Sequence, residues 1–260
     1  MTAISITTVL YNNQVETVQK LVKNILMVTK GFEQVDYYLV NNSIDNKVLT
    51  SYLNGLDRKH LVHVITPTEN KGFGAGNNLV IPILRSDYHL LVNPDVFVKS
   101  SNEIINMVHF MDTHKEYGLL SPLIKFPNGE VQHLLKREST VLDMVLRFTG
   151  LPFFSKRKER FVNLPDGYRS LHEASNVPGS FMLFRTNIFK DIRGFDERYF
   201  LYMEDSDITK KVNAISKTIF YPNACIYHEW QRKNKKSVHG IVQMMNSTIK
   251  YFNKWGWKFL

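Results

Sequence analysis

The segment His-Leu-Leu-Val-Asn-Pro-Asp-Val-Phe-Val (His89–Val98) is an apolar run followed at once by a polar turn. The run predicts a buried strand over Tyr88–Val92, and Asp95 follows it closely. In an open α/β sheet, a carboxylate at the carboxyl end of a strand points into the crevice where ligands bind. An ordinary turn or helix-capping role is the commoner one for an aspartate in Asn-Pro-Asp. The functional interpretation of Asp95 therefore depends on what accompanies it along the chain.

Strands and helices alternate on the amino-terminal side of this segment. Apolar, β-branched runs predict strands over Ala3–Leu10, Tyr37–Val40 and Leu61–Thr66. Between the first two, apolar residues recur at helical spacing up to Gly31, which ends the helix. The apolar positions of that helix are Val18, Leu21, Val22, Ile25 and Val28. This alternation predicts a mostly parallel sheet with helices on both faces.

After Pro122 the predicted strands and helices no longer alternate regularly. Phe126–Glu130 predicts a hairpin turn, and the basic segment Leu151–Ala174 predicts an irregular loop. Regular strands and helices are predicted again towards the end of the chain. The strands expected there are Ser180–Arg185, Thr218–Tyr221 and Ala224–Tyr227, and the helices are Glu204–Val212 and Val238–Phe252.

The composition is that of an ordinary globular chain with an uneven charge. The 260 residues carry a net charge of +9, and the segment from residue 208 onwards has ten Lys or Arg against Glu229 alone. Such a region favours an anionic partner, although a solvated basic face is the commoner explanation. The single cysteine, Cys225, excludes an internal disulfide, and we expect neither a signal peptide nor a membrane span.

The glycine-rich turn Lys71–Asn78 suggests a nucleotide-binding loop but fails as a dinucleotide fingerprint. Gly72 and Gly74 begin a G-x-G, yet the third glycine of G-x-G-x-x-G would fall on Asn77. The turn also follows the third predicted strand, whereas the fingerprint follows the first. Tight-turn geometry alone explains such glycines about as well as a nucleotide does.

A second acidic cluster, Tyr202–Asp207 (Tyr-Met-Glu-Asp-Ser-Asp), lies far downstream and is followed by His228. Acids in the first turn of a helix are favourable in any protein, and His228 has an alternative role as a satisfied core histidine. Each ordinary explanation is the better one for its residue alone. The joint order of a strand-tip carboxylate, an acidic pair and a late histidine predicts a metal ligand, a base and a second metal ligand.

Motifs along the whole chain resemble those of the family 2 inverting glycosyltransferases, and most of all the bacterial rhamnosyltransferases of surface-polysaccharide (O-antigen) assembly. The matching segments are Thr8–Asn12, Val40–Ser43, Asn70–Asn78, Asn93–Val96, Pro178–Arg185, Gly194–Asp207, His228 and Tyr251–Trp257. The resemblance implies the glycosyltransferase-A fold, a Rossmann-like α/β class. It implies one domain, with a nucleotide-sugar-binding half over residues 1–121, an acceptor half over 122–230 and a basic amphipathic tail over 231–260.

The resemblance also assigns roles to the acids and the histidine. Asn93-Pro-Asp95 resembles a metal-binding D-x-D motif whose first acid is replaced, which leaves Asp95 and His228 as ligands of Mg²⁺ or Mn²⁺. Such a site needs few protein ligands because the diphosphate and water complete the octahedron. Asp205 is the expected general base, which takes the proton from the acceptor hydroxyl. Glu204, Asp207 and Trp230 are expected to support the base or bind the acceptor.

Further residues are expected to bind the nucleotide sugar. They are Thr8, Tyr11, Asn41, Asn42, Lys71, Gly72, Gly74, Asn78, Asn93 and Asp95. Asn41 departs from the pattern, since relatives usually have an aspartate there that contacts the nucleotide base. An amide both donates and accepts, so pyrimidine pairing stays open while the identity of the base is in doubt.

The resemblance implies transfer of a sugar, with inversion, to a lipid-linked oligosaccharide. L-rhamnose from dTDP-L-rhamnose is the expected donor, and UDP-galactofuranose or a UDP-hexose is the alternative. A non-catalytic nucleotide-sugar-binding protein is disfavoured because the acids and the histidine are all present, and no nucleic-acid-binding fold is indicated. The expected location is cytoplasmic, peripheral on the inner face of the bacterial cytoplasmic membrane, through Arg232, Lys233, Lys235, Lys236 and the helix that follows them.

Overall fold

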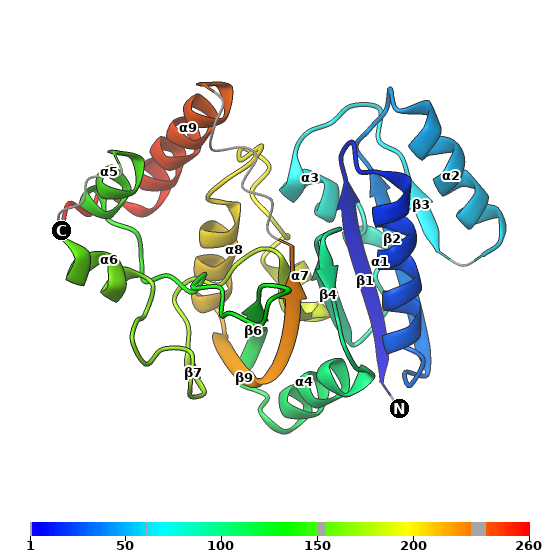
Figure 1. The fold of residues 1–260 in the computed structure, drawn as a ribbon, viewed down its shortest axis with the longest axis horizontal. Coiled ribbons are helices and arrows are strands. Elements are labelled where there is room, and N and C mark those ends of the chain that lie inside the picture. Colours follow the sequence, from blue (N-terminus) through cyan, green and yellow to red (C-terminus); the bar gives the residue numbers. More distant parts are fainter. Residues whose placement is uncertain (1, 61, 150–153, 230–237) are drawn as a thin grey trace.

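A computed structural model describes residues 2–60, 62–149, 154–229 and 238–260 of the protein. One mixed sheet runs through it in the strand order β3-β2-β1-β4-β8-β6-β9-β5, and β7 pairs with β9 beside this path (Figure 1). The strands are β1 (Ala3–Leu10), β2 (Gln34–Asn41), β3 (His63–Ile65), β4 (Tyr88–Val92), β5 (Val96–Phe97), β6 (Tyr117–Lys125), β7 (His172–Glu173), β8 (Phe181–Arg185) and β9 (Lys217–His228).

Helices connect these strands and cover the sheet. They are α1 (Val15–Val28), α2 (Lys47–Arg58), α3 (Phe73–Asn78), α4 (Ser101–Thr113), α5 (Val141–Thr149), α6 (Ser155–Phe161), α7 (Thr186–Asp191), α8 (Glu204–Asn213) and α9 (Val238–Trp255), with a 3₁₀ turn over Ile81–Ile83. Side-chain caps fix two of the starts: the Asn46 carboxamide accepts from Leu49 N–H at 3.0 Å, and Ser100 Oγ accepts from Asn102 N–H at 3.2 Å.

The amino-terminal half is the parallel sheet that the sequence predicts. β1 pairs in parallel with β2 and β4, and β2 pairs in parallel with β3. Antiparallel pairs enter with β8, which lies between β4 and β6, and with β5 and β7, which both pair with the edge of β9 opposite β6. β6 and β9 are parallel to each other.

Alternating side chains place a hydrophobic core on each face of the sheet, as predicted. Along β8, Phe181 and Leu183 face the core that α1 and α4 cover, while Met182 and Phe184 face the core that α7 and α8 cover. These four side chains are fully buried. A third, smaller cluster joins α5 and α9 to the body of the protein through Met144, Tyr199, Met203, Tyr251 and Phe252.

Two expectations about the carboxyl-terminal half are corrected. The predicted loop Leu151–Ala174 contains the helix α6 and the strand β7 among its described residues, since a short charged helix gives no apolar periodicity to detect. The two strands predicted over Thr218–Tyr221 and Ala224–Tyr227 are one strand, β9. Its pairing with β6 shifts register between Tyr221 and Cys225, so the Pro-Asn sequence bulges the strand without ending it.

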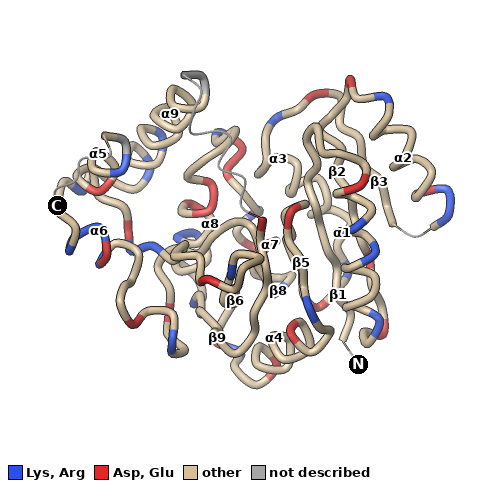
Figure 2. Tube along the Cα trace, in the orientation of Figure 1, with Lys and Arg blue, Asp and Glu red and all other residues tan. Residues whose placement is uncertain are grey.

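The last helix, α9, is amphipathic and only half covered. Tyr251 and Phe252 are buried, whereas Ile241, Met245 and Ile249 are each at least 41% exposed. None of the helices among the described residues combines the length and the apolar character needed to cross a bilayer. Basic residues lie on α6 and α9, and the acidic start of α8 lies nearer the middle of the molecule (Figure 2).

Candidate functional site

A cavity of about 670 Å³ opens where β4 ends and β8 begins. Backbone pairing fixes this junction, because Asn93 N–H donates to the Ser180 carbonyl at 2.9 Å. The cavity brings together five residues predicted from separate motifs, namely Asn93, Asp95, Glu204, Asp205 and His228. Its other lining residues are Phe73, His133, Leu134, Lys136, Asp143, Leu146, Arg147, Lys158, Phe161, Val162, Pro178, Gly179, Ser180, Leu201, Tyr202 and Met244.

Asp95 and His228 are neighbours because β5 pairs with the end of β9. Val96 lies opposite His228 in the antiparallel register, and Glu229 N–H donates to the Asp95 carbonyl at 2.9 Å. His228 Nε2 is 3.2 Å from Asp95 Oδ1. The Asp95 side chain is 21% exposed and that of His228 only 6%, so the carboxylate is the more accessible of the two from the cavity.

Gln132 sets the orientation and the tautomer of His228. The Gln132 Nε2 group donates to the His228 carbonyl at 2.6 Å and lies 3.4 Å from the Lys125 carbonyl, which places the amide nitrogen on the carbonyl side. Its Oε1 then faces His228 Nδ1 at 3.1 Å and accepts a hydrogen bond from Nδ1–H. A neutral His228 therefore turns the Nε2 lone pair towards Asp95. Gln132 has no sequence signal, since it follows an ordinary turn.

The Asp95–His228 pair fits a divalent cation for which the protein supplies only a minority of the ligands. A neutral imidazole lone pair and a carboxylate oxygen at 3.2 Å are two acceptors facing each other, an arrangement that a cation or a shared proton stabilises. The residues that the structure describes contain no group of three or more His, Cys, Asp or Glu placed to bind a metal. Asp95 and His228 could thus hold Mg²⁺ or Mn²⁺ only with phosphate oxygens and water as the remaining ligands.

The acidic pair stands at the first turn of α8. Tyr202 and Met203, both with positive φ, turn the chain so that Glu204 and Asp205 begin the helix at the cavity wall. Lys136 Nζ is 3.4 Å from Asp205 Oδ2, with 15% of the Lys136 side chain and 21% of the Asp205 side chain exposed. Burial lowers the pKa of Lys136, while the charge of Asp205 acts in the opposite direction.

Glu204 is the more buried of the two acids and has different surroundings from its neighbour. Burial, and then the negative charge of Asp205, raises the pKa of Glu204 well above the usual range. Its Oε2 atom has no hydrogen-bond partner among the described residues. The pair therefore consists of a buried carboxyl with a raised pKa, Glu204, and a more exposed acid, Asp205, that faces a lysine. Two acids in such different surroundings are typical of acid-base catalysis.

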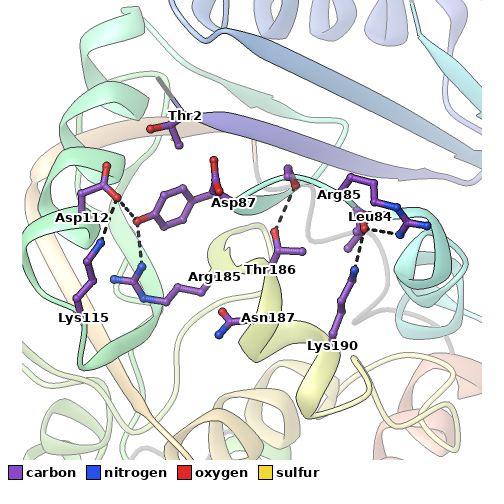
Figure 3. A pocket seen from close by; sticks show the side chains of 12 residues that line it. Thr2, Leu84, Arg85, Asp87, Asp112, Lys115, Arg185, Thr186, Asn187 and Lys190 are labelled. Atoms are coloured by element: carbon purple, nitrogen blue, oxygen red, sulfur yellow. Dashed lines mark hydrogen bonds and ion pairs between the residues drawn. The ribbon is translucent and has the colours of Figure 1, made fainter.

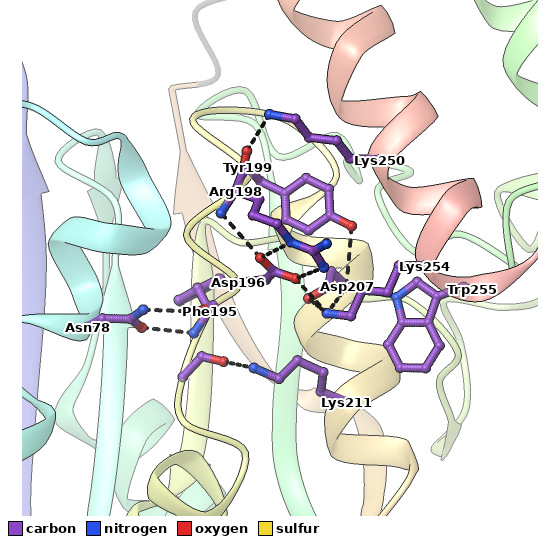
Figure 4. Close-up of polar contacts among 11 residues, drawn as sticks. Asn78, Phe195, Asp196, Arg198, Tyr199, Asp207, Lys211, Lys250, Lys254 and Trp255 are labelled. Carbon is purple, nitrogen blue, oxygen red and sulfur yellow. Dashed lines mark hydrogen bonds and ion pairs between the residues drawn. The ribbon is translucent and has the colours of Figure 1, made fainter.

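Asp207 is placed differently from the other predicted acids. Its side chain is buried and does not line the cavity. It accepts from Trp255 Nε1 at 2.7 Å and pairs with Lys254 Nζ at 2.7 Å, and both partners lie on α9 (Figure 4). Tyr199 Oη lies 3.5 Å from the same carboxylate. The geometry favours a role for Asp207 in fixing α9 to α8.

Lys254→Met should therefore destabilise the protein. It leaves the buried Asp207 carboxylate without its cation, a change that typically costs about 3–5 kcal/mol, and the 22% exposure of Lys254 places it at the lower end of that range. The measurement is the free energy of unfolding in urea. Lys250→Met is the matched control on the same helix, because it loses only a bond to the Arg198 carbonyl, about 1 kcal/mol. Equal losses in the two variants would show that Asp207 does not depend on Lys254.

The predicted glycines pack against the segment that leads to the acidic pair. A Cβ on Gly72, which has φ of +99°, would lie 2.1 Å from the Phe200 carbonyl oxygen, and one on Gly74 would lie 2.8 Å from Phe195. Asn78 clamps that segment with its amide: Oδ1 accepts from Phe195 N–H at 2.8 Å and Nδ2 donates to the Phe195 carbonyl at 2.9 Å (Figure 4). The glycine-rich turn thus positions the approach to α8 by close contact.

The Asn41 and Asn42 amides are buried beside this turn. Asn41 Nδ2 donates to Thr50 Oγ1 at 2.9 Å and its Oδ1 accepts from Ser43 N–H at 3.0 Å, so both ends of the amide are occupied. Asn42 Nδ2 donates to the Gly72 carbonyl at 3.2 Å, and its Oδ1 has no partner among the described residues. Of the two amides, Asn42 is the one whose acceptor atom lacks a partner among the described residues, and that atom is buried.

The remaining predicted residues have mixed surroundings. The Thr8 hydroxyl is buried against Tyr37 Oη at 3.1 Å, and Tyr11 is 62% exposed at the end of β1. Lys71 Nζ pairs with Glu69 at 3.1 Å on the surface. The prediction for Trp230 lies outside the described residues, as does that for the basic cluster Arg232, Lys233, Lys235 and Lys236.

A second cavity, of about 630 Å³, lies at the other end of the parallel strands, beside Thr2 and Asp87 (Figure 3). Its charged groups have partners within the protein: Arg185 donates to Tyr88 Oη at 3.0 Å, Tyr88 Oη donates to Asp112 at 2.8 Å, and Lys190 donates to the Leu84 carbonyl at 2.7 Å. None of the predicted site residues that the structure describes lines it. The carboxyl ends of the strands, where ligands bind in such sheets, belong to the first cavity.

Comparison with known proteins finds curated relatives but no matching family model. The chain is 26% identical over 188 residues to N-acetylglucosaminyl-diphospho-decaprenol L-rhamnosyltransferase of Mycobacterium tuberculosis, which covers 64% of this chain and 58% of that one. It is 23% identical over 165 residues to rhamnosyltransferase WbbL of Escherichia coli, which covers 58% and 57% respectively. The chain thus matches less than two thirds of the length of either relative.

Solved structures share the fold at low identity. Mannosyltransferase PcManGT from Pyrobaculum calidifontis, solved with GDP-Man and Mn²⁺, matches with a TM-score of 0.66 at 13% identity, over 96% of this chain and 64% of that one. Residues 1–349 of S. aureus TarS, solved with UDP, match with a TM-score of 0.60 at 16% identity, over 96% and 66%. The chain has the glycosyltransferase-A fold, and the resemblance of its motifs to those of the family 2 glycosyltransferases is confirmed.

Proposed function

We propose that the protein is a metal-dependent inverting glycosyltransferase that moves L-rhamnose from dTDP-L-rhamnose to a hydroxyl of a lipid-linked oligosaccharide. One observation carries the proposal: a single cavity brings the Asp95–His228 pair and the Glu204–Asp205 pair together from distant parts of the chain. The names of both curated relatives support the sugar. The acceptor that the mycobacterial name prints supports a saccharide on a polyprenol diphosphate.

Asp95 and His228 would hold the cation at the donor diphosphate. Bound there, Mg²⁺ or Mn²⁺ would act as a Lewis acid and neutralise the charge that develops on the departing nucleoside diphosphate. Gln132 Oε1 accepts a hydrogen bond from His228 Nδ1–H, which leaves the Nε2 lone pair of His228 facing Asp95 and the proposed cation. Asn93, whose amide carries no charge, lines the same wall and is a candidate donor of a hydrogen bond to phosphate.

Asp205 would act as the general base in a single displacement. The acceptor hydroxyl oxygen attacks the anomeric carbon, the bond from that carbon to the diphosphate oxygen breaks, and the hydroxyl proton passes to Asp205. Lys136 stabilises the carboxylate form of Asp205 before the reaction. A neutral Glu204 can donate a hydrogen bond to the acceptor, and its unpartnered Oε2 can accept one.

Gln132→Met should weaken Mn²⁺ binding. The change removes the acceptor that fixes the His228 tautomer, and loss of such an orienting partner typically lowers metal affinity about 10–100-fold. The measurement is a titration with Mn²⁺ followed by electron paramagnetic resonance, in the presence of dTDP. Glu130→Gln, an exposed change on the same turn, is the control and should bind as the parent does. Unchanged affinity in Gln132→Met would contradict the orienting role.

Two alternatives to this function, another donor sugar and a non-catalytic binding protein, make different demands on these residues. Another donor, UDP-galactofuranose or a UDP-hexose, would leave the same residues in the same roles, and the buried, fully bonded Asn41 amide gives no preference between bases. A non-catalytic nucleotide-sugar-binding protein would not need a base beside a buried lysine. The Asp205–Lys136 pair therefore favours an enzyme.

A turnover assay on a donor panel tests the proposal. The purified protein is incubated with Mn²⁺, an N-acetylglucosaminyl polyprenyl diphosphate and one of dTDP-L-rhamnose, UDP-galactofuranose, UDP-glucose or UDP-galactose. Mass spectrometry then detects the extended acceptor. We expect product with dTDP-L-rhamnose. Product with a UDP-sugar alone would replace the donor assignment, and donor binding without product from any of them would favour the binding protein.

A membrane-bound acceptor implies a place of action. We propose that the protein works in the cytoplasm, peripheral on the inner face of the cytoplasmic membrane, where a polyprenol-linked acceptor is presented. The exposed apolar residues of α9 support such a position, because amphipathic helices of this kind lie in membrane interfaces.

A further inference from the structure

An apolar groove of about 500 Å³ lies between α5 and α9, at one end of the molecule (Figure 1). Its lining residues are Val141, Met144, Val145, Arg147, Thr149, Ile241, Met244, Met245, Thr248, Ile249, Phe252 and Trp257. Five of these apolar side chains, Val145, Ile241, Met245, Ile249 and Trp257, are between 41% and 50% exposed. An apolar surface of this kind, concave and left open, marks a binding site more often than a chance feature of a monomer.

The groove adjoins the cavity that holds the acidic pair. Arg147 and Met244 line both spaces, so the two share a wall. Three cations, Lys136, Arg147 and Lys158, line the cavity together with Asp143, whose carboxylate is paired with Arg157 at 2.7 Å. The charge of Arg147 contributes to lowering the pKa of the buried Lys136, after the larger effect of burial, which indicates how near the two cations are to each other.

Resting on the proposed function, we propose that the groove binds the polyprenyl chain of the acceptor and that Arg147 contacts its diphosphate. Such an acceptor has three parts in sequence: a sugar hydroxyl, a diphosphate and an apolar chain. The protein offers three surfaces in the same sequence: the carboxylate Asp205, the cations around Arg147, and the groove between α5 and α9. Guanidinium groups bind phosphate in a planar, bidentate manner, and a methylene chain gains free energy by leaving water for an apolar surface.

Two acceptors that differ only in chain length test the groove. They are N-acetylglucosaminyl diphosphate esterified with decaprenol and with geraniol, both in detergent micelles, and the quantity measured is kcat/KM. The parent should prefer the decaprenyl acceptor by about 10-fold or more, since a longer chain buries more apolar surface. Met245→Asp and Val145→Asp should remove this preference, because each places a charge in the groove, and should lower kcat/KM for the decaprenyl acceptor at least about 10-fold more than for the geranyl acceptor.

Val242→Asp is the matched control. Val242 lies on the same helix, is 49% exposed against 50% for Met245, and does not line the groove. It should keep the chain-length preference. An equal loss in Val242→Asp would mean that α9 adsorbs to the micelle as a whole, and an unchanged preference in Met245→Asp would mean that the chain binds elsewhere. Either result overturns the proposal.

Two further measurements separate the groove from its alternatives. Light scattering would show whether the parent is a dimer that Met245→Asp dissociates, in which case the groove is an interface between copies and the proposal fails. If no acceptor is turned over, the proposed function is at fault, and binding of decaprenyl diphosphate, followed by tryptophan fluorescence in a Trp230→Phe, Trp255→Phe background that keeps Trp257, tests the groove without catalysis. Binding to the parent that Met245→Asp weakens at least about 10-fold supports the groove, and equal binding overturns it.

Discussion

Asp95→Ala is expected to abolish detectable transfer and to weaken Mn²⁺ binding in the presence of dTDP. Asp95 supplies the accessible carboxylate of the pair with His228, and a metal's Lewis-acid contribution of several kcal/mol corresponds to a rate loss of about 10²-fold or more. The fold should persist, since the Asp95 side chain is partly exposed at a turn and belongs to none of the hydrophobic clusters. The measurements are kcat/KM, Mn²⁺ affinity and the unfolding midpoint in urea.

Asp87→Ala serves as the control for Asp95. Asp87 precedes β4 at the other end of the strand, where its carboxylate accepts from Ala3 N–H at 2.9 Å. Its loss should leave kcat/KM and Mn²⁺ affinity unchanged. Full activity of Asp95→Ala, or full activity of the parent in excess EDTA, would show that Asp95 and His228 do not bind a catalytic metal.

Asp205→Asn is expected to lower kcat on the order of 10²–10⁴-fold, the usual contribution of a general base. The amide preserves the shape of the side chain and removes its basicity, so the affinity for dTDP-L-rhamnose should change little. The measurement separates the two quantities, with steady-state rates for kcat and calorimetry for donor binding. Donor affinity that falls in step with kcat would show that Asp205 binds the donor and is not the base.

Glu204→Gln is the comparison that identifies the base. Burial raises the pKa of Glu204 to about 8, so glutamine imitates the uncharged carboxyl at neutral pH and most of the rate should survive. The raised pKa of Glu204 also predicts how stability depends on pH. The carboxyl ionises at lower pH in the unfolded chain than in the folded protein, so the free energy of unfolding falls as pH rises between the unfolded and the folded pKa. Glu204→Gln should remove that fall. A dead Glu204→Gln beside an active Asp205→Asn would exchange the roles of the two acids.

The parts of the fold that the sequence predicts are those governed by local pattern. β1 and β4 have the predicted bounds, Ala3–Leu10 and Tyr88–Val92, because each is a short, buried, apolar run between polar turns. The helix α6 could not be predicted in this way, since Ser155–Phe161 is charged around most of its surface. The bulge in β9 was also hidden, because Pro222-Asn223 is a turn signal that the neighbouring strand overrides by pairing on both sides.

The candidate site shows the same division between local and long-range information. The order of the motifs predicts that Asp95, Asp205 and His228 are site residues. Their proximity depends on the pairing of β5 with β9 and of β4 with β8, which no local sequence pattern contains. Gln132 carries no motif, and only its position across from His228 gives it a role. Asp207 lies in the same acidic motif as Asp205, yet its place two positions further along α8 turns its side chain towards α9.

The stereochemistry of the product tests the central claim most directly. Asp205 as the base of a single displacement predicts that the new linkage has the anomeric configuration opposite to that of the donor. The measurement is the NMR coupling at the anomeric carbon of the transferred sugar, on product made by the purified protein with Mn²⁺, dTDP-L-rhamnose and the geranyl acceptor. Inversion is the result that this account predicts. Retention would contradict it, because one base and one displacement at this cavity cannot preserve the configuration.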